Sequence, residues 1–247
     1  MDMSRVAIVA ALEREVRPLI REWRTTDREI DGRRFRFFEK DDVVLICGGI
    51  GAGAARRAAE AVIAIYAPRV IYSVGFAGAT HAGLKVGDIL LPRRLVNAGD
   101  GSSVNLNEGE GVLLSFESVA SPEQKAKLRD SYGAEAVDME AAAVARAAEA
   151  RGTAFAVVKV ISDEYDFSFP STERFVDANG QFLEKRFGWF LALRPWLWPQ
   201  VAGLARNSKR ASGALSDRLR TMIAAQGAPS SAGPQLTMTN GDSRSSQ

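Results

Sequence analysis

Short, nearly unbroken runs of apolar residues recur along the chain and predict buried strands. The runs are Val6 to Ala11, Val43 to Cys47, Val70 to Val74 and Ala156 to Ile161. None of them alternates regularly between apolar and polar residues, as a strand with one face in water would. We therefore expect strands that are covered on both faces, which is typical of a parallel sheet between layers of helices.

Capped or amphipathic segments between these runs predict the helices. A short helix is expected from Glu13, because acidic residues in its first turn suit the helix dipole. A longer helix is expected over Ala54 to Tyr66, and another over Pro122 to Tyr132 with Ser121 as its cap. An alanine-rich helix follows Glu140.

Strands and helices thus alternate as far as Asp163. Further strands are expected at 33–39, 89–91 and 112–116, and a loop at the polar, glycine-rich residues 97–110. This alternation predicts a single α/β domain with a central mixed, mostly parallel sheet flanked by helices. Past Pro170 the composition changes. We expect the α/β domain at residues 1–170, an aromatic and basic helical extension at 171–225 and a disordered tail at 226–247.

The overall composition narrows the functional classes. The chain has 247 residues, of which 46% are hydrophobic and 25% charged, and its net charge is +2. This balance gives no general argument for nucleic acid as a partner. A single cysteine and a single histidine exclude an internal disulfide framework and a structural zinc site. We expect a cytoplasmic protein without metal or cofactor, in which the thiol of Cys47 is buried and inert; a reactive thiol is the alternative.

Acidic residues stand at two junctions between Gly133 and Asp163. Asp138 and Glu140 precede the alanine-rich helix, and Asp163 ends a β-branched strand. Ligands of open α/β sheets bind in the crevice at the carboxyl ends of the strands, so Glu140 and Asp163 are candidate active-site residues. The structural alternatives are a helix-dipole acid for Glu140 and a helix or turn cap for Asp163. Asp138 is expected to be a helix-start acid.

The segment Gly49-x-Gly51-x-x-Ala54 lies between a strand and a helix and matches the dinucleotide-binding pattern in form. That pattern also needs an acidic residue at the end of the next strand, where this chain has the sequence VGF. The missing acid argues against NAD. The backbone N–H groups of this loop remain candidates for binding an anion or a polar ligand, and a tight packing turn is the alternative.

A series of short motifs runs from residue 10 to residue 163. They are AALEREV (10–16), GGIGAGAA (48–55), SVGFAGA (73–79), LKVGDILLP (84–92), AVDMEAAAVA (136–145) and VVKVISD (157–163). In this order they resemble the purine nucleoside phosphorylase and nucleosidase superfamily, within it the methylthioadenosine/S-adenosylhomocysteine nucleosidases and the hopanoid-associated phosphorylases. The resemblance implies a nucleoside phosphorylase-like fold, a homodimer, and cleavage of a purine N-glycosidic bond through an oxocarbenium-like transition state.

The resemblance also implies roles for individual residues. Glu140 matches the glutamate that binds the ribose hydroxyls, and Met139 the methionine packed under the sugar. Asp163 matches the aspartate that gives a proton to the leaving purine, and Ser162 is its neighbour. A carboxyl group can act as such an acid near neutral pH only if burial raises its pKa, and Asp163 follows an apolar strand as this requires.

The acceptor side of the reaction depends on two other segments. Glu15 matches the acid that activates the attacking water in the nucleosidases, and Glu13 competes for this role. Phe76, Ala77 and Gly78 form a second glycine-rich loop that is expected to contact the substrate. The bulky ring of Phe76 narrows the place where phosphate would bind. Water is therefore the favoured acceptor, and phosphorolysis with phosphate is the alternative.

Residues 93–111 depart from the family, which has a longer segment with a helix at this place. We expect a short loop here, so the substrate pocket is incompletely defined, and Val119 is expected in its wall. The predicted substrate is a small-molecule purine nucleoside, a 5′-modified adenosine that releases adenine. A catalytically silent nucleoside-binding protein is the alternative from another functional class.

The C-terminal extension is rich in aromatic and basic residues, which suit the interface of a membrane. These residues are Phe182, Phe187, Trp189, Phe190, Trp196 and Trp198, with Lys185, Arg186, Arg194 and Arg206. The same composition suits a helix that packs on the core or across a dimer. Peripheral contact with the inner face of the membrane is therefore one hypothesis, and packing within the protein is the other.

Overall fold

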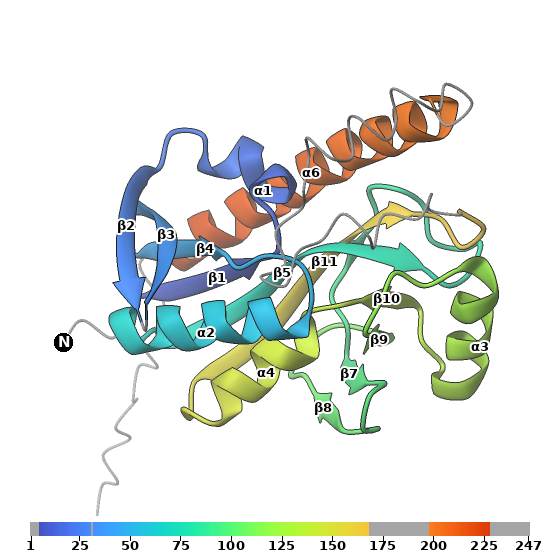
Figure 1. The fold of residues 1–247 in the computed structure, drawn as a ribbon, viewed down its shortest axis with the longest axis horizontal. Coiled ribbons are helices and arrows are strands. Elements are labelled where there is room, and N and C mark those ends of the chain that lie inside the picture. The colour runs from blue at the N-terminus through green and yellow to red at the C-terminus, as the bar shows by residue number, and fades with distance from the viewer. Residues whose placement is uncertain (1–4, 31, 168–197, 228–247) are drawn as a thin grey trace, which may run out of the picture.

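The computed structural model describes residues 5–30, 32–167 and 198–227, without the side chains of 198–201 and 226–227. Through this part of the chain runs a mixed sheet of 11 strands with helices on both faces (Figure 1). The strands are β1 (Val6–Ala10), β2 (Arg24–Ile30), β3 (Arg33–Lys40), β4 (Val43–Cys47), β5 (Val70–Ala79), β6 (Ile89–Leu90), β7 (Arg94–Asn97), β8 (Ser103–Asn105), β9 (Val112–Ser115), β10 (Ala136–Asp138) and β11 (Ala154–Asp163).

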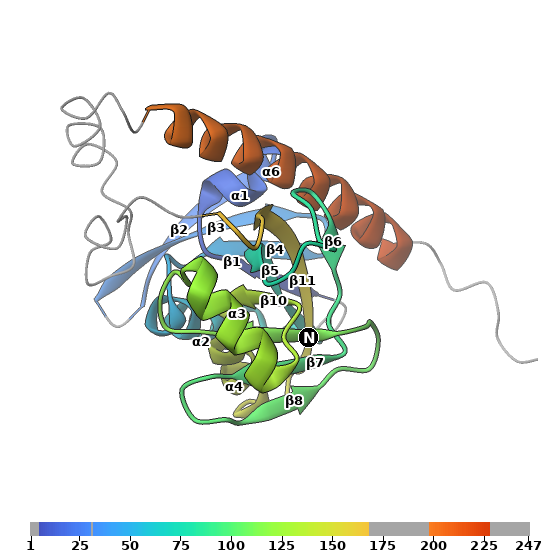
Figure 2. The same ribbon diagram turned by 90° about the vertical axis from the view of Figure 1, so that its right-hand side faces the viewer.

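The helices predicted before residue 170 are all present, and the described part of the predicted helical extension, which begins at residue 198, is also helical. They are α1 (Glu13–Ile20), α2 (Ala52–Tyr66), α3 (Pro122–Tyr132), α4 (Ala141–Glu149) and α6 (Trp198–Gly227). α3 begins as predicted: the Ser121 hydroxyl accepts a hydrogen bond from the backbone N–H of Gln124, whose side chain in turn accepts from the Ser121 N–H. α1 and α6 cover one face of the sheet and α2 and α4 the other, while α3 lies beside β9 (Figures 1 and 2).

Parallel pairing forms the centre of the sheet. β4, β1, β5 and β11 lie side by side in parallel, and β10, β9 and β7 form a second parallel group. The two groups are joined by antiparallel pairing between β5 and β10. β2, β3, β6 and β8 add antiparallel pairs around this centre. The predicted α/β fold with a central mixed sheet is confirmed.

The apolar runs are buried on both faces of the sheet. On one face, β1 and β11 pack with Val16 of α1 and Leu215 of α6, and on the other, β1 and β4 pack with Val62 of α2 and Val144 of α4. Every residue of β1 is buried. Because each large apolar side chain contributes about 1.5–3 kcal/mol on burial, these two layers are the main source of stability.

β5 is longer than predicted and contains the second glycine segment, which is therefore a strand rather than a loop. It passes through Gly75 and Phe76 and ends at Ala79. Gly75 has φ +139°, and a Cβ atom there would lie 2.7 Å from Oε2 of Glu15. Glycine thus lets the strand pass close to this carboxylate while it stays paired with β11.

The prediction of a short loop over residues 93–111 is wrong. β7 pairs in parallel with β9, and β8 folds back on β7. Leu95 and Val96 of β7 are buried, but polar neighbours hide this short apolar stretch in the sequence. β2 was also not predicted. It is a largely exposed strand whose Asp27 forms ion pairs with two arginines of β3, so it lacks the apolar pattern of a strand.

The described part of the C-terminal extension is one long helix. Ala211, Leu215 and Leu219 of α6 are fully or almost fully buried against α1 and the sheet. The extension therefore shares a hydrophobic core with the α/β domain over this stretch. The boundaries of the three predicted segments stay predictions.

Most of the residues that suggest membrane contact fall in 168–197, outside the described part of the chain. Arg206 lies exposed on α6. None of the described helices combines the length and apolar character needed to cross a membrane. Peripheral membrane contact and a homodimer stay predictions.

We predict that Leu215→Ala lowers the free energy of unfolding by about 2–5 kcal/mol, since it removes a buried side chain and leaves a cavity between α6, α1 and β11. Urea unfolding followed by circular dichroism measures the change. Lys209→Ala, at an exposed position of the same helix, is the matched control. Equal stability of the two variants would show that α6 does not belong to the cooperative core.

Candidate active site

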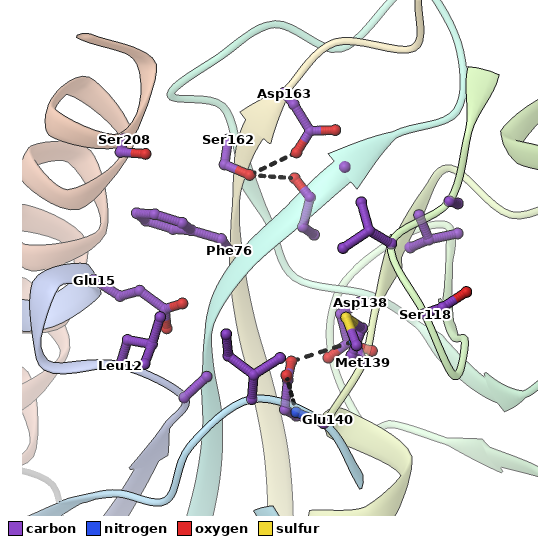
Figure 3. Close-up of a pocket in the computed structure, with 18 of the residues that line it drawn as sticks. Leu12, Glu15, Phe76, Ser118, Asp138, Met139, Glu140, Ser162, Asp163 and Ser208 are labelled. Atoms are coloured by element: carbon purple, nitrogen blue, oxygen red, sulfur yellow. Dashed lines mark hydrogen bonds between the residues drawn. The ribbon is translucent and has the colours of Figure 1, made fainter. Parts of the chain in front are cut away.

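One cavity of about 520 Å³ opens where β1, β5 and β11 end and α1, α2 and α4 begin (Figure 3). This is the crevice that the sequence predicts. All the predicted site residues line it: Glu15, Phe76, Ala77, Gly78, Val119, Met139, Glu140, Ser162 and Asp163. The structure thus brings together residues that are far apart in the sequence, while their roles in catalysis stay predictions.

Glu140 is held at the floor of the cavity by backbone N–H groups. Its Oε1 accepts a hydrogen bond from the N–H of Gly51 at 2.8 Å, and its Oε2 from the N–H of Met139 at 3.2 Å (Figure 3). The glycine loop before α2 therefore binds an anion that belongs to the chain itself. This accounts for the glycine pattern without a dinucleotide.

Asp138 ends β10, and its carboxylate binds the first N–H of α4, as expected of a helix-start acid; it also forms a buried ion pair that was not predicted. Its Oδ2 accepts from the N–H of Ala141 at 2.9 Å and lies 2.8 Å from Nζ of Lys159. Its Oδ1 accepts from the hydroxyl of Ser115 at 2.6 Å. Burial opposes the charge of Lys159, but the neighbouring carboxylates of Asp138 and Glu140 outweigh it and raise the pKa of the lysine. Lys159 is therefore a fixed cation below the cavity.

Burial also acts on Glu140. It raises the pKa of this carboxyl above its ordinary value; the Lys159 ammonium opposes the rise, and the Asp138 carboxylate adds to it. The two hydrogen bonds from backbone N–H groups favour the charged form. Burial thus opposes the charged form of Glu140 more than its surroundings favour it.

Glu15 is a buried acid of the cavity with one oxygen unpartnered within the described part of the chain. It is 5% exposed, and its Oε2 has no hydrogen-bond partner among the described residues. Burial, reinforced by the Glu140 carboxylate and opposed by Lys159, raises the pKa of Glu15 from 4.5 to about 7. Glu13, the competing candidate, is half exposed, lies 3.6 Å from Arg36 and does not line the cavity. The geometry therefore favours Glu15 over Glu13.

Asp163 lies at another part of the cavity wall, in a second buried ion pair. Its Oδ2 is 2.5 Å from Nζ of Lys125, and its Oδ1 accepts from the hydroxyl of Ser162 at 2.7 Å. The side chains of Lys125 and Asp163 are only 2% and 5% exposed. The predicted burial of Asp163 is present, but its lysine partner was not predicted. Nothing in the sequence of α3 separates the buried Lys125 from the exposed Lys127.

Gly78 makes room for this ion pair. A Cβ atom at Gly78 would lie 2.6 Å from Oδ2 of Asp163 and 3.0 Å from Cε of Lys125. Any side chain there would displace one of the two charged groups. Gly78, which the sequence predicts to lie in a substrate-binding loop, is therefore needed in β5 to leave space for the ion pair.

The rest of the wall comes from two segments on opposite sides of the cavity. Ser118 and Val119 precede α3, and Leu204 and Ser208 come from α6, on the side where Phe76 and Glu15 lie (Figure 3). The contribution of α6 was not predicted, because its residues follow a stretch with no recognisable motif. The shape of the cavity thus depends on the C-terminal helix.

Other reactive groups lie outside this cavity. Cys47 is partly buried at the end of β4, and burial raises the pKa of its thiol well above its usual value, which favours the inert thiol. Within the residues that the structure describes, no group of three or more His, Cys, Asp and Glu side chains is placed to hold a metal ion.

Comparison with known proteins identifies the family to which the chain belongs. The family model described as the phosphorylase superfamily matches residues 5–123 and 105–191, together well over half of the chain. The chain belongs to the phosphorylase superfamily. The family membership inferred from the motifs is confirmed.

Individual relatives can be named within this class. A 5′-methylthioadenosine/S-adenosylhomocysteine nucleosidase of Bacillus licheniformis is 26% identical over 197 residues, which cover 64% of this chain and 85% of that protein. The corresponding nucleosidase of a Marinomonas species is 28% identical over 200 residues, covering 65% and 86%.

Solved structures show the same fold. A nucleosidase of this kind from Helicobacter pylori has a TM-score of 0.69 at 18% identity and covers 91% of this chain and 100% of its own. The futalosine hydrolase of Helicobacter pylori has a TM-score of 0.67 at 18% identity and covers 90% and 98%.

We predict that Glu15→Gln removes a pH dependence of stability. Between about pH 4.5 and 7 the wild-type Glu15 carries a proton in the folded state but not in the unfolded state, so stability falls as pH rises through this window. At 1.36 kcal/mol per pKa unit, the rise from 4.5 to about 7 corresponds to about 3 kcal/mol. Relative to wild type, the variant should therefore gain about 3 kcal/mol between pH 4 and pH 8.

Urea unfolding at a series of pH values measures this difference. Glu13→Gln, which changes a half-exposed acid two residues away, should follow the wild-type profile. If the Glu15→Gln and wild-type profiles run parallel, Glu15 does not titrate near pH 7 in the folded protein.

Proposed function

We propose that the protein cleaves the N-glycosidic bond of a purine nucleoside and that water is the acceptor. One observation carries the proposal: a single cavity holds a buried carboxyl with a pKa of about 7, a carboxylate held by backbone N–H groups, and a buried acid–lysine pair. These groups match the needs of the reaction, which are a base for water, a partner for the sugar and a proton for the leaving purine.

The sugar is assigned to Glu140 and Met139. The carboxylate of Glu140 accepts from backbone N–H groups and retains lone pairs for two ribose hydroxyls. Its negative charge favours the positive charge that develops on the ribosyl group. Because this charge appears only in the transition state, the interaction lowers the barrier rather than merely tightening binding.

Water activation is assigned to Glu15. A base with a pKa of about 7 is half ionised at neutral pH, and its Oε2 has no partner among the described residues. As the bond between C1′ and the purine nitrogen breaks, water adds to C1′ and passes a proton to Glu15. The purine leaves with the bonding electron pair and takes a proton from the Asp163 end of the cavity.

The substrate class rests on the relatives. The curated relatives named above are nucleosidases for 5′-methylthioadenosine and S-adenosylhomocysteine, so we propose a 5′-modified adenosine as substrate and adenine as product. Leu12, Phe76 and Leu204 supply apolar surface on one side of the cavity, which suits a 5′ substituent. Leu204 gives α6 a place in substrate selection.

Phosphorolysis is the second candidate, and Arg14 is the observation that favours it. Arg14 lines the cavity next to Glu15 and supplies a guanidinium group of the kind that binds phosphate. The carboxylate of Glu15 at the same place would repel phosphate, and Phe76 occupies space beside it. We therefore favour water.

The proposal is tested by mixing the protein with 5′-methylthioadenosine, with and without phosphate, and following free adenine. We expect release without phosphate, accompanied by free methylthioribose. Release that strictly requires phosphate would replace hydrolysis by phosphorolysis. No release from adenosines with small or lipid-linked 5′ groups would leave a nucleoside-binding protein without turnover.

We predict that the rate of hydrolysis rises with pH through about 7, since Glu15 must lose its proton to accept one from water. Glu15→Gln should lower kcat by about 10²–10⁴-fold, the usual contribution of a general base. The pH profile of kcat for wild type and for Glu13→Gln measures the effect. A kcat that falls on raising the pH from 6 to 8 would contradict the role of Glu15.

A further inference from the structure

The ion pair between Lys125 and Asp163 places a lysine in the cavity wall where the sequence motifs predict only an acid. Lys125 donates to Oδ2 of Asp163 at 2.5 Å and to the backbone carbonyl of Glu164 at 2.8 Å. An ammonium group has three N–H donors. Its third donor is not used by these two contacts, and the residue lines the cavity together with Gly78, Ser162 and Asp163.

The position of Lys125 is costly for the fold. It lies in the first turns of α3, where the helix dipole disfavours a cation, and its side chain is 2% exposed. A buried ion pair is on average no more stabilising than well-packed apolar side chains of similar size. Lys125 compensates the buried charge of Asp163, and it also places an ammonium group in the wall of the cavity.

We infer that Lys125 is a catalytic residue that supplies the proton to the leaving purine, and that Asp163 positions it. This inference rests on the proposed function and names the residue that protonates the purine in the same site. As the bond from C1′ to the purine breaks, the electron pair moves into the base, and the third N–H of Lys125 passes its proton to a ring nitrogen. The lysine becomes a neutral amine and regains a proton from solvent after the base departs, while the proton of the attacking water is on Glu15.

The surroundings of Lys125 suit this role. Asp163 and the Glu164 carbonyl hold two of its donors and fix the direction of the third. Gly78 has no side chain that would separate the lysine from the cavity. In a site with little water, a fixed ammonium group also stabilises the negative charge that develops on the base.

The inference is tested by changing the leaving group. Nitrophenolate departs without a proton, so a general acid matters for a purine nucleoside and hardly at all for 4-nitrophenyl ribofuranoside. For Lys125→Met in the full chain, we expect kcat on 5′-methylthioadenosine to fall by about 10²–10⁴-fold and the rate on the nitrophenyl compound to fall by less than about fivefold. Lys127→Met, an exposed position of the same helix, should leave both rates unchanged.

A second variant guards against misfolding. Lys125→Met alone leaves Asp163 buried without its partner, so Lys125→Met/Asp163→Asn, which removes both charges, should show the same selective loss. An equal loss on both substrates would make Lys125 a structural residue and overturn the inference. So would full activity of Lys125→Met on the nucleoside, with the proposed function intact.

The two proposals fail in different ways. If the wild type cleaves neither compound, the proposed function is wrong and the role of Lys125 falls with it. If the wild type cleaves the nucleoside but not the nitrophenyl compound, the N7-methylated nucleoside takes its place, because its base leaves as a neutral molecule. Lys125→Met must then retain activity on the methylated nucleoside and lose it on the parent, or the inference is overturned.

Discussion

The ion pair between Asp138 and Lys159 is the contact on which the rest of the site depends. Asp138 ends β10, and its two oxygens accept from Ser115 of β9, from the first N–H of α4 and from Lys159 of β11. One carboxylate therefore joins three strands and a helix at the floor of the cavity. Both side chains are at most 1% exposed, and buried charges persist only when they are paired and fully hydrogen-bonded.

This arrangement leaves the cavity short of positive charge. Lys159 is the cation nearest to Asp138, Glu140 and Glu15 together, and it is already paired with Asp138. Glu140 is compensated by two backbone N–H groups, whereas Oε2 of Glu15 has none among the described residues. Burial and the neighbouring Glu140 carboxylate raise the pKa of Glu15 to about 7. A positively charged ribosyl group would supply the missing charge, which is the condition for selective stabilisation of the transition state.

The fold and the predicted site residues were accessible from the sequence because they follow local patterns. Apolar runs fixed the central strands, and motif order identified the family. β2 and β7 were missed because their neighbours in the sheet, rather than their own composition, make them strands. Lys159 stands inside an otherwise apolar strand, and a charge in such a place signals a buried partner. Lys125 carries no such signal, because in sequence it is one of several polar residues of α3 and only the tertiary structure buries it.

Two glycines of β5, Gly75 and Gly78, leave space for charged groups at two places along the strand. Gly75 makes room for Glu15, and Gly78 makes room for Asp163 and Lys125. They are three residues apart, which is about 10 Å along a strand. The two glycines therefore place Glu15 and the Asp163–Lys125 pair at separate positions along β5. Asp163 has Lys125 as its own partner, whereas Glu15 shares Lys159 with Asp138 and Glu140. The two carboxyls can therefore differ in role.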